Sequence, residues 1–159
     1  MIADIAVRLA TLSDAADIAA MSRDYIEQGL PWTWTEGRIA KAIRDPETNV
    51  VVAGDASAIA TPITGFGIMF YASDDAHLLL FAVRSAHQRR GVGSAILRWL
   101  EGVARAAGAT RIRVECLREN SVARNFYCEH GYHELDIAKK FYRGLKDGIH
   151  LEKWLRESA

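Results

Sequence analysis

The hydrophobic positions along the chain repeat with two periods, one typical of strands and one typical of helices. Alternation and short apolar runs predict seven strands, at residues 2–8, 49–55, 63–71, 77–83, 111–116, 132–137 and 149–154. Spacings of three and four residues predict four helices, at residues 14–28, 36–45, 91–107 and 121–130. The third helix is the clearest, because Ile96, Leu97, Leu100 and Val103 share one face. This succession predicts one α/β domain that spans residues 1–159.

Polar residues and glycines mark the ends of these helices. Ser13 and Thr35 precede the first two helices and are suited to cap them. Asn120 or Ser121 caps the last helix, and Gly108 ends the third.

Composition narrows the classes of function. Twenty basic and twenty acidic residues give zero formal net charge among 159 residues, which argues against a general nucleic-acid binder. The longest apolar run, Leu78–Val83, is six residues, far too short to cross a bilayer, and no basic segment typical of a secretory signal follows Met1. We therefore expect a cytoplasmic protein without a membrane partner. The two cysteines and five histidines have no metal-ligand spacing, so no metal site is expected.

One loop combines glycine with positive charge at the start of a helix. It runs from Val83 to Ser94 and includes Gln88-Arg89-Arg90-Gly91-Val92-Gly93. Free amides and the helix dipole make such a place suitable for phosphate. The lysine of a P-loop is missing, and Ile96 stands where a dinucleotide fold has its third glycine. The loop alone therefore leaves two interpretations open, a phosphate site or a capped helix with exposed arginines.

Two segments carry a family resemblance. Gln88-Arg89-Arg90-Gly91-Val92-Gly93 resembles the Q/R-x-x-G-x-G/A pyrophosphate loop of the GNAT superfamily of acyl-CoA N-acyltransferases. The segment from Asn120 to Tyr127, followed by Gly131-Tyr132, begins 27 residues after Gly93 and is similar to the family signature N-x-x-A-x-x-[LF]-Y. The resemblance implies an α/β (α+β) fold with a mixed, mostly antiparallel sheet of six to seven strands and about four helices. It also implies acetyl-CoA as cosubstrate and no metal.

A closer resemblance covers only the second half of the chain. Val114-Glu115-Cys116 and Lys140-Phe141-Tyr142 resemble the bacterial ribosomal-protein N-terminal alanine acetyltransferases. The first half, which would bind the acceptor, does not share it.

The superfamily resemblance assigns coenzyme A to three segments. The pantetheine arm is expected along the strand end 81–83, the pyrophosphate on the amides of residues 89–94, and Asn120 near the pantetheine or thiol. Arg124 either meets the nucleotide end or is an ordinary surface arginine. The expected coenzyme-binding residues are Phe81, Ala82, Val83, Gln88, Arg89, Arg90, Gly91, Val92, Gly93, Ser94, Asn120 and Arg124.

Tyr127 matches the tyrosine that the family is thought to use as general acid toward the departing thiolate. A phenol has a pKa of about 10 and a thiol of about 8.5, so positioning decides whether the phenol can donate. The alternative is a core tyrosine that closes the last helix onto the sheet.

The general base is open between Glu115, His77 and water. Many family members carry a carboxylate on the strand before the pyrophosphate loop, and this chain has none there. Glu115 lies 12 residues before the tyrosine and matches the glutamate that the N-terminal alanine acetyltransferases use through water. An α-amine, with a pKa of about 8, is easier to deprotonate in this way than a lysine at about 10.4. The alternative for Glu115 is a surface glutamate paired with Arg111 or Arg113.

The acceptor is expected between residues 29–35 and the C-terminal strands. Trp32 and Trp34 are suited to line a pocket, and Tyr142 joins them through the closer resemblance. Tryptophans two apart in an extended segment face opposite ways, so we expect only one to be buried. The expected reaction is direct attack of a primary amine on acetyl-CoA in a ternary complex, with a protein or peptide N-terminus as one acceptor. A small-amine acetyltransferase acting on an aminoglycoside, polyamine or amino acid is an alternative, as is a non-catalytic acyl-CoA-binding regulatory module. Monomer and homodimer are both left open.

Overall fold

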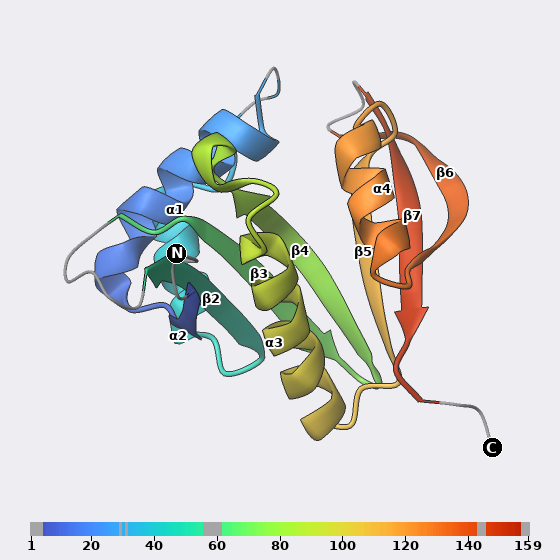
Figure 1. Ribbon diagram of the computed structural model, residues 1–159, viewed down its shortest axis with the longest axis horizontal. Helices are drawn as coiled ribbons and strands as arrows, with labels where there is room; N and C mark the ends of the chain where they lie inside the picture. Colours follow the sequence, from blue (N-terminus) through green and yellow to red (C-terminus); the bar gives the residue numbers. More distant parts are fainter. Residues whose placement is uncertain (1–4, 29, 31, 56–61, 143–145, 157–159) are drawn as a thin grey trace.

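A seven-stranded sheet forms the centre of the molecule (Figure 1). The computed structural model describes residues 5–28, 30, 32–55, 62–142 and 146–156, with residues 55 and 140–142 described for the main chain only. The strands are β1 (Ile5–Leu9), β2 (Thr48–Asp55), β3 (Gly65–Ala72), β4 (Asp75–Val83), β5 (Arg111–Leu117), β6 (His133–Tyr142) and β7 (Lys146–Trp154). Within the described residues the α-helices are α1 (Ala15–Met21), α2 (Glu36–Arg44), α3 (Val92–Ala106) and α4 (Ser121–Glu129). The predicted mixed sheet of six to seven strands with about four helices is confirmed.

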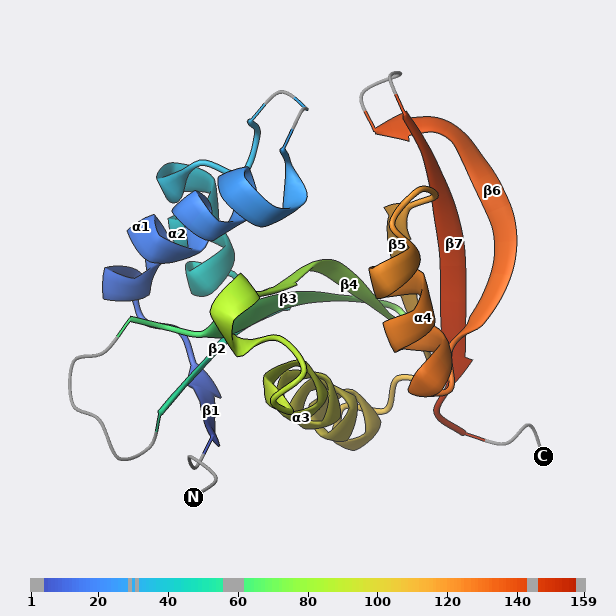
Figure 2. The same ribbon diagram turned by 45° about the horizontal axis from the view of Figure 1, so that its top comes forward.

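The helices cover the two faces of the sheet in different places (Figure 2). α1 and α2 pack on one face of β2–β4, where Ile18, Ile39, Phe66 and Ile68 form a buried cluster. α3 and α4 lie on the other face, over a second cluster that extends across β4, β5 and β7. The side chains of β2, β3 and β4 alternate between these two clusters, whereas β5 buries Ile112, Val114 and Cys116 on the α3–α4 face only.

The strand order is β1-β2-β3-β4-β5-β7-β6, and every neighbouring pair is antiparallel except β4 and β5. These two strands pair at four positions, from Asp75 opposite Arg111 to Leu78 opposite Val114. Beyond that point they diverge (Figure 1). We call the opening between residues 79–83 and 115–117 the β4–β5 gap.

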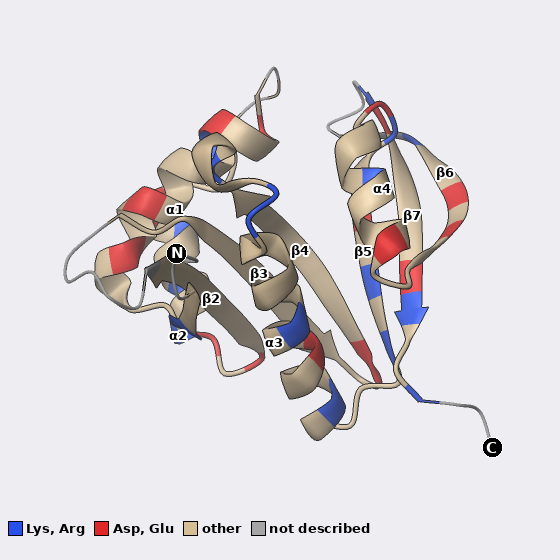
Figure 3. Ribbon diagram, viewed as in Figure 1, with Lys and Arg blue, Asp and Glu red and all other residues tan. Residues whose placement is uncertain are grey.

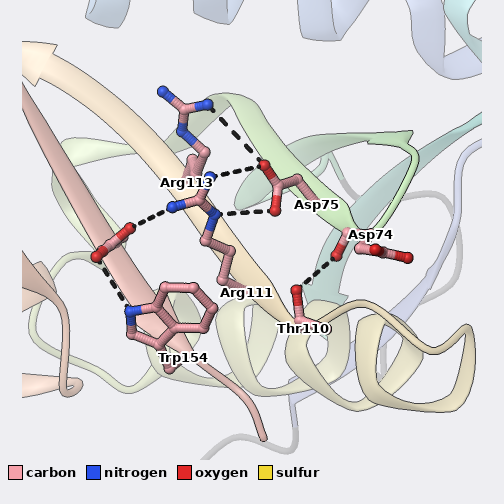
Figure 4. A network of polar contacts seen from close by, with 7 residues as sticks. Asp74, Asp75, Thr110, Arg111, Arg113 and Trp154 are labelled. Atoms are coloured by element: carbon pink, nitrogen blue, oxygen red, sulfur yellow. Dashed lines mark hydrogen bonds and ion pairs between the residues drawn. The ribbon is translucent and has the colours of Figure 1, made fainter. Parts of the chain in front are cut away.

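A polar network holds the closed end of the divergent strands together (Figure 4). The Arg111 guanidinium donates to both carboxylate oxygens of Asp75, at 2.9 and 3.1 Å, and to Glu152 of β7 at 2.9 Å. Arg111 also lies over the Trp154 ring, 5.1 Å from its centroid. The hydrogen bonds from Arg111 hold the pKa of Asp75 below its usual value. β4, β5 and β7 are thus joined at the closed end of the ladder, away from the gap.

The N-terminal caps of the helices agree with those predicted from the sequence, except for the cap of the first helix. Thr35 accepts a hydrogen bond from the Arg38 amide at 3.4 Å, and Asn120 accepts one from Ala123 at 3.1 Å, so both predicted caps are present. The cap predicted at Ser13 is wrong, because the chain starts with a 3₁₀ turn, Leu12–Asp14, in which the Asp14 carboxylate accepts the Thr11 amide at 2.8 Å. The helix predicted over 14–28 also ends earlier, in a π-helical turn at Ser22–Ile26. In the part of the chain that the structure describes, no helix is long and apolar enough to cross a membrane.

Candidate active site

The β4–α3 loop, residues 84–91, carries two left-handed residues directly before a helix. Arg89 has a φ of +63° and Gly91 one of +86°, and α3 begins at Val92. Such conformations turn successive amides to one side, and the first turn of a helix adds N–H groups without an intrahelical partner. Arg89 and Arg90 are exposed, and the loop before α3 is drawn in blue, the colour of Lys and Arg, in Figure 3. The residues present therefore fit a diphosphate.

Two side chains of the loop hold it against the rest of the domain. The Gln88 side chain donates to the carbonyl of Val83 at 3.1 Å. Arg84 forms an ion pair with Asp17 of α1 and donates to the carbonyl of Ile63 at 2.7 Å. Gln88 thus supports the loop through its side chain, and the loop is anchored to α1 and to the start of β3.

The first turn of α3 packs closely against α4. A Cβ on Gly93 would lie 3.3 Å from both the Phe81 and the Phe126 ring, so glycine permits this approach. The two rings stack with centroids 5.4 Å apart. Ser94 Oγ lies 2.8 Å from His130 Nε2, and His130 Nδ1 lies 2.8 Å from the Phe126 carbonyl. Because a carbonyl only accepts, Nδ1 of a neutral His130 carries the hydrogen and Nε2 accepts from Ser94.

Tyr127 is the buried residue of α4 and points into the core. Its side chain is 4% exposed and meets Phe126 and Tyr132 edge-on, each with centroids 5.6 Å apart. Phe81 of β4 lies 6.1 Å away on a third side. The ring is therefore held from three directions, on the side of the sheet that carries α3 and α4.

Asn120 and Arg124, which are predicted to bind coenzyme, have structural partners. Asn120 is exposed and uses its side-chain oxygen as the α4 cap. Arg124 makes a bidentate ion pair with Glu134 of β6, at 2.8 and 2.9 Å, and donates to the Arg118 carbonyl at 2.9 Å. This arrangement agrees with the alternative of a surface arginine, and a coenzyme contact by either residue stays a prediction.

A β-bulge in β4 lies at the mouth of the β4–β5 gap. Met69 of β3 pairs with Leu78 and Ile68 pairs with Leu80, so Leu79 is an extra residue. Leu79 is 41% exposed although it lies in the middle of the sheet. Bulges re-aim side chains and end strand pairing, as this one does.

The predicted pantetheine residues follow the bulge. Phe81 and Val83 pack toward α3, and Ala82 packs toward α1 and α2. Residues 80–83 pair with β3 but not with β5, and successive amides of a strand point to opposite edges. Alternate N–H groups of this segment therefore point into the gap.

Glu115 lies on the opposite face of the sheet from Tyr127. It alternates with Val114 and Cys116, which are buried on the α3–α4 face, and it is the first β5 residue beyond the last pair with β4. Its side chain is 18% exposed, with His150 Nε2 3.9 Å away, and His150 Nδ1 lies 2.7 Å from Asp136. Glu115 thus has a histidine partner rather than the arginines of the alternative prediction.

The segment before α2 is fixed by a buried carboxylate. Glu27 accepts hydrogen bonds from the Thr33 hydroxyl at 2.6 Å, the Thr33 amide at 2.7 Å and Ser22 at 3.0 Å. Burial by itself raises the pKa of Glu27, but these hydrogen bonds and one from Trp34 outweigh it and lower the pKa. Trp34 is partly buried against the core and Trp32 is 43% exposed, so the two rings differ in exposure as expected, but neither is fully buried.

Two predicted residues remain. One lies away from the β4–β5 gap, and the side chain of the other is not among those that the structure describes. His77 pairs with Arg113 in the closed part of the β4–β5 ladder, below the gap. The side chain of Tyr142 lies outside the described residues.

The two cysteines differ in burial. Burial raises the pKa of Cys116 to about 11, so this thiol stays protonated near neutral pH. Cys128 is exposed. Among the described residues, no cluster of His, Cys, Asp and Glu is suited to hold a metal ion.

Three residues in this region had no sequence-based prediction: Glu27, His130 and His150. Strand alternation could have placed His150 on the face of Glu115 once the β5–β7 register was known. Glu27 and His130 carry no local signal, because their partners come from a loop and from another helix.

Comparison with known proteins supports one family. Residues 18–132 match the model of the acetyltransferase (GNAT) family. No curated protein matches the chain significantly.

Solved structures share the fold at low sequence identity. The ribosomal-protein-S18-alanine N-acetyltransferase from Escherichia coli has a TM-score of 0.78 and 21% identity, over 98% of this chain and 97% of that one. The paia N-acetyltransferase from Thermoplasma acidophilum, in complex with coenzyme A, has a TM-score of 0.78 and 17% identity, over 95% of this chain and 99% of that one. The structure of yncA from Salmonella typhimurium, with its cofactor acetyl-CoA, has a TM-score of 0.77 and 18% identity, over 98% of this chain and 96% of that one. Because the family model covers most of the chain and the fold agrees, the chain belongs to the acetyltransferase (GNAT) family and uses acetyl-CoA for acetyl transfer.

Proposed function

We propose that residues 1–159 form a single N-acetyltransferase domain that transfers the acetyl group of acetyl-CoA to a primary amine by direct attack in a ternary complex. One observation carries the proposal: Glu115 and Tyr127 lie on opposite faces of the sheet, next to a gap where β4 and β5 are unpaired. A base on one face can deprotonate the amine, and an acid on the other can protonate the departing sulfur of the same intermediate, only through such an opening.

The coenzyme side of the reaction uses the α3–α4 face. When bound, acetyl-CoA supplies a thioester whose carbonyl carbon is the electrophile. The amides of residues 89–94, with Arg89 and Arg90, bind the diphosphate. The free edge of residues 79–83 binds the pantetheine and directs an N–H to the carbonyl oxygen, where charge develops. Tyr127, held by its three aromatic neighbours, donates a proton to the departing sulfur.

The acceptor side uses the α1–α2 face. The acceptor amine lies between Trp32, Trp34 and the β5–β7 strands, and Glu115 removes its proton through a water molecule. We propose a protein or peptide N-terminus as the acceptor. Support comes from the spacing of Glu115 and Tyr127, and from the shared fold with the alanine N-acetyltransferase. A free α-amine also needs a weaker base than a lysine does.

A screen of amines tests this function. Peptides with a free N-terminal alanine, the same peptides blocked at the N-terminus, polyamines and aminoglycosides are incubated with protein and acetyl-CoA while free thiol is followed. We expect thiol release with the free peptides and none with the blocked ones. Release only with polyamines or aminoglycosides would overturn the proposed acceptor, and no release by protein that binds acetyl-CoA would indicate a non-catalytic binding module.

A further inference from the structure

Three titratable side chains form a continuous polar row across β5, β7 and β6 on the acceptor face. Glu115 pairs with His150 across the β5–β7 ladder, and His150 pairs with Asp136 across the β7–β6 ladder. Side chains directly opposite each other in an antiparallel ladder share a face. His150 Nε2 lies 3.9 Å from Glu115, and Nδ1 lies 2.7 Å from Asp136.

A bulge in β6 creates this row. Glu134 pairs with Leu151 and Asp136 pairs with His150, so Leu135 is an extra residue in β6. Without it, Glu134 and Asp136 would face the same way. With it, Glu134 points toward α4 and binds Arg124, while Asp136 points to the other face and binds His150.

Exposure increases along the row. The side chains of Glu115, His150 and Asp136 are 18%, 26% and 68% exposed. The row therefore leads from the edge of the β4–β5 gap to open solvent. The next pair along the same face is Arg113 opposite Glu152.

We propose that His150 is a positioning residue that relays the amine proton from Glu115 to solvent, with Asp136 fixing its tautomer. This inference rests on the proposed function. Asp136 accepts the Nδ1 hydrogen, which leaves the lone pair of Nε2 directed at Glu115. After Glu115 has taken a proton from the amine through water, its O–H bond breaks and an Nε2–H bond forms by transfer through a second water molecule, because the 3.9 Å between Nε2 and Glu115 exceeds hydrogen-bond length. The imidazolium lies between two carboxylates until Nε2 releases the proton to water, which returns Glu115 and His150 to their starting states.

The 15N chemical shifts of the His150 ring test the tautomer without any acceptor or coenzyme. We expect the neutral ring to carry its hydrogen on Nδ1 in the wild type. Asp136→Asn, whose amide can donate to Nδ1, is expected to shift the ring toward the Nε2–H form. A wild-type ring with its hydrogen on Nε2 would overturn the relay.

Kinetics test the relay itself. His150→Gln is expected to lower kcat at least about tenfold with little change in KM for acetyl-CoA, and less than Glu115→Gln, which removes the base and costs roughly 10²–10⁴. Added imidazole should restore part of kcat in His150→Ala, which a purely structural role does not predict. His133→Gln is the matched control, since His133 is an exposed histidine of the neighbouring strand β6.

Failure of the relay and failure of the proposed function give different results. Wild-type kcat in a folded His150→Gln protein, while the wild type acetylates amines, would overturn only the relay. If the wild type binds acetyl-CoA but acetylates no amine, the proposed function fails, and the relay fails with it.

Discussion

Replacing Gly91 by aspartate should weaken coenzyme A binding through charge. Gly91 has a φ of +86° at the residue before α3, so its substituent would project beside the amides that we propose bind the diphosphate. Two unit charges at about 5 Å repel by about 0.8–1.7 kcal/mol for an effective dielectric constant of roughly 40–80, suited to an exposed position. The diphosphate carries about two charges, so we expect a loss of about 1.5–3 kcal/mol, or roughly tenfold to a hundredfold in Kd.

Asparagine at the same position is the matched control. Asn and Asp have nearly the same volume, and both tolerate the left-handed conformation better than other residues with a Cβ. Among the residues that the structure describes, a Cβ at Gly91 would meet only Ile5, at 3.7 Å, which is ordinary contact. The difference between the Asp and Asn variants therefore isolates the charge.

Calorimetric titration with coenzyme A at low and high salt measures this difference. We expect Gly91→Asp to bind at least about tenfold more weakly than Gly91→Asn at low ionic strength, and the ratio should shrink as salt screens the charge. Equal affinities at low salt in two folded variants would refute the assignment of the diphosphate to this loop.

Three further predictions follow from the same geometry. Arg89→Ala should weaken coenzyme A binding less than Gly91→Asp, and more at low than at high ionic strength, because the side chain is exposed; the same titrations check this. Tyr127→Phe should lower kcat roughly 10²–10⁴-fold with little change in KM for acetyl-CoA, whereas a purely structural tyrosine would show a lower Tm with nearly intact turnover. Asp75→Asn should cost roughly 1 kcal/mol of stability at pH 6. Because Arg111 lowers the folded-state pKa of Asp75, that contribution is full above the unfolded pKa of about 4 and is lost as pH falls through the folded value. Urea unfolding at pH 6, 4 and 3 should therefore show the gap between wild type and variant closing.

The features that could be predicted from the sequence are those that depend on neighbouring residues in the chain. Glycine at the start of α3 signals the loop conformation, because a φ of +86° is a local requirement. The different exposure of Trp32 and Trp34 follows from alternation in an extended segment. The two caps at Thr35 and Asn120 are likewise local.

The features that could not be predicted depend on contacts between strands or helices. The bulges at Leu79 and Leu135 become visible only when each strand is aligned with its partner, and each one reverses which face the following residues occupy. Asp136 would otherwise share a face with Glu134, so the sequence alone could not join it to His150. The early end of the first helix has a similar origin, since the Glu27 carboxylate is held by Thr33 and Trp34 from the following segment.

The two sides of the sheet differ in which elements lie next to the β4–β5 gap. On the coenzyme face, Ser94 of α3 contacts His130 directly after α4, and Gly93 leaves room for Phe126 of α4, so the first turn of α3 packs against α4. On the acceptor face, α1 and α2 pack over β2–β4, and the described part of β5–β7 presents the row that begins at Glu115. A bound diphosphate at the start of α3 would therefore act on the helix that carries Tyr127, while an acceptor would meet Glu115 without displacing either helix. Coenzyme binding is for this reason expected to influence the acid more than the base.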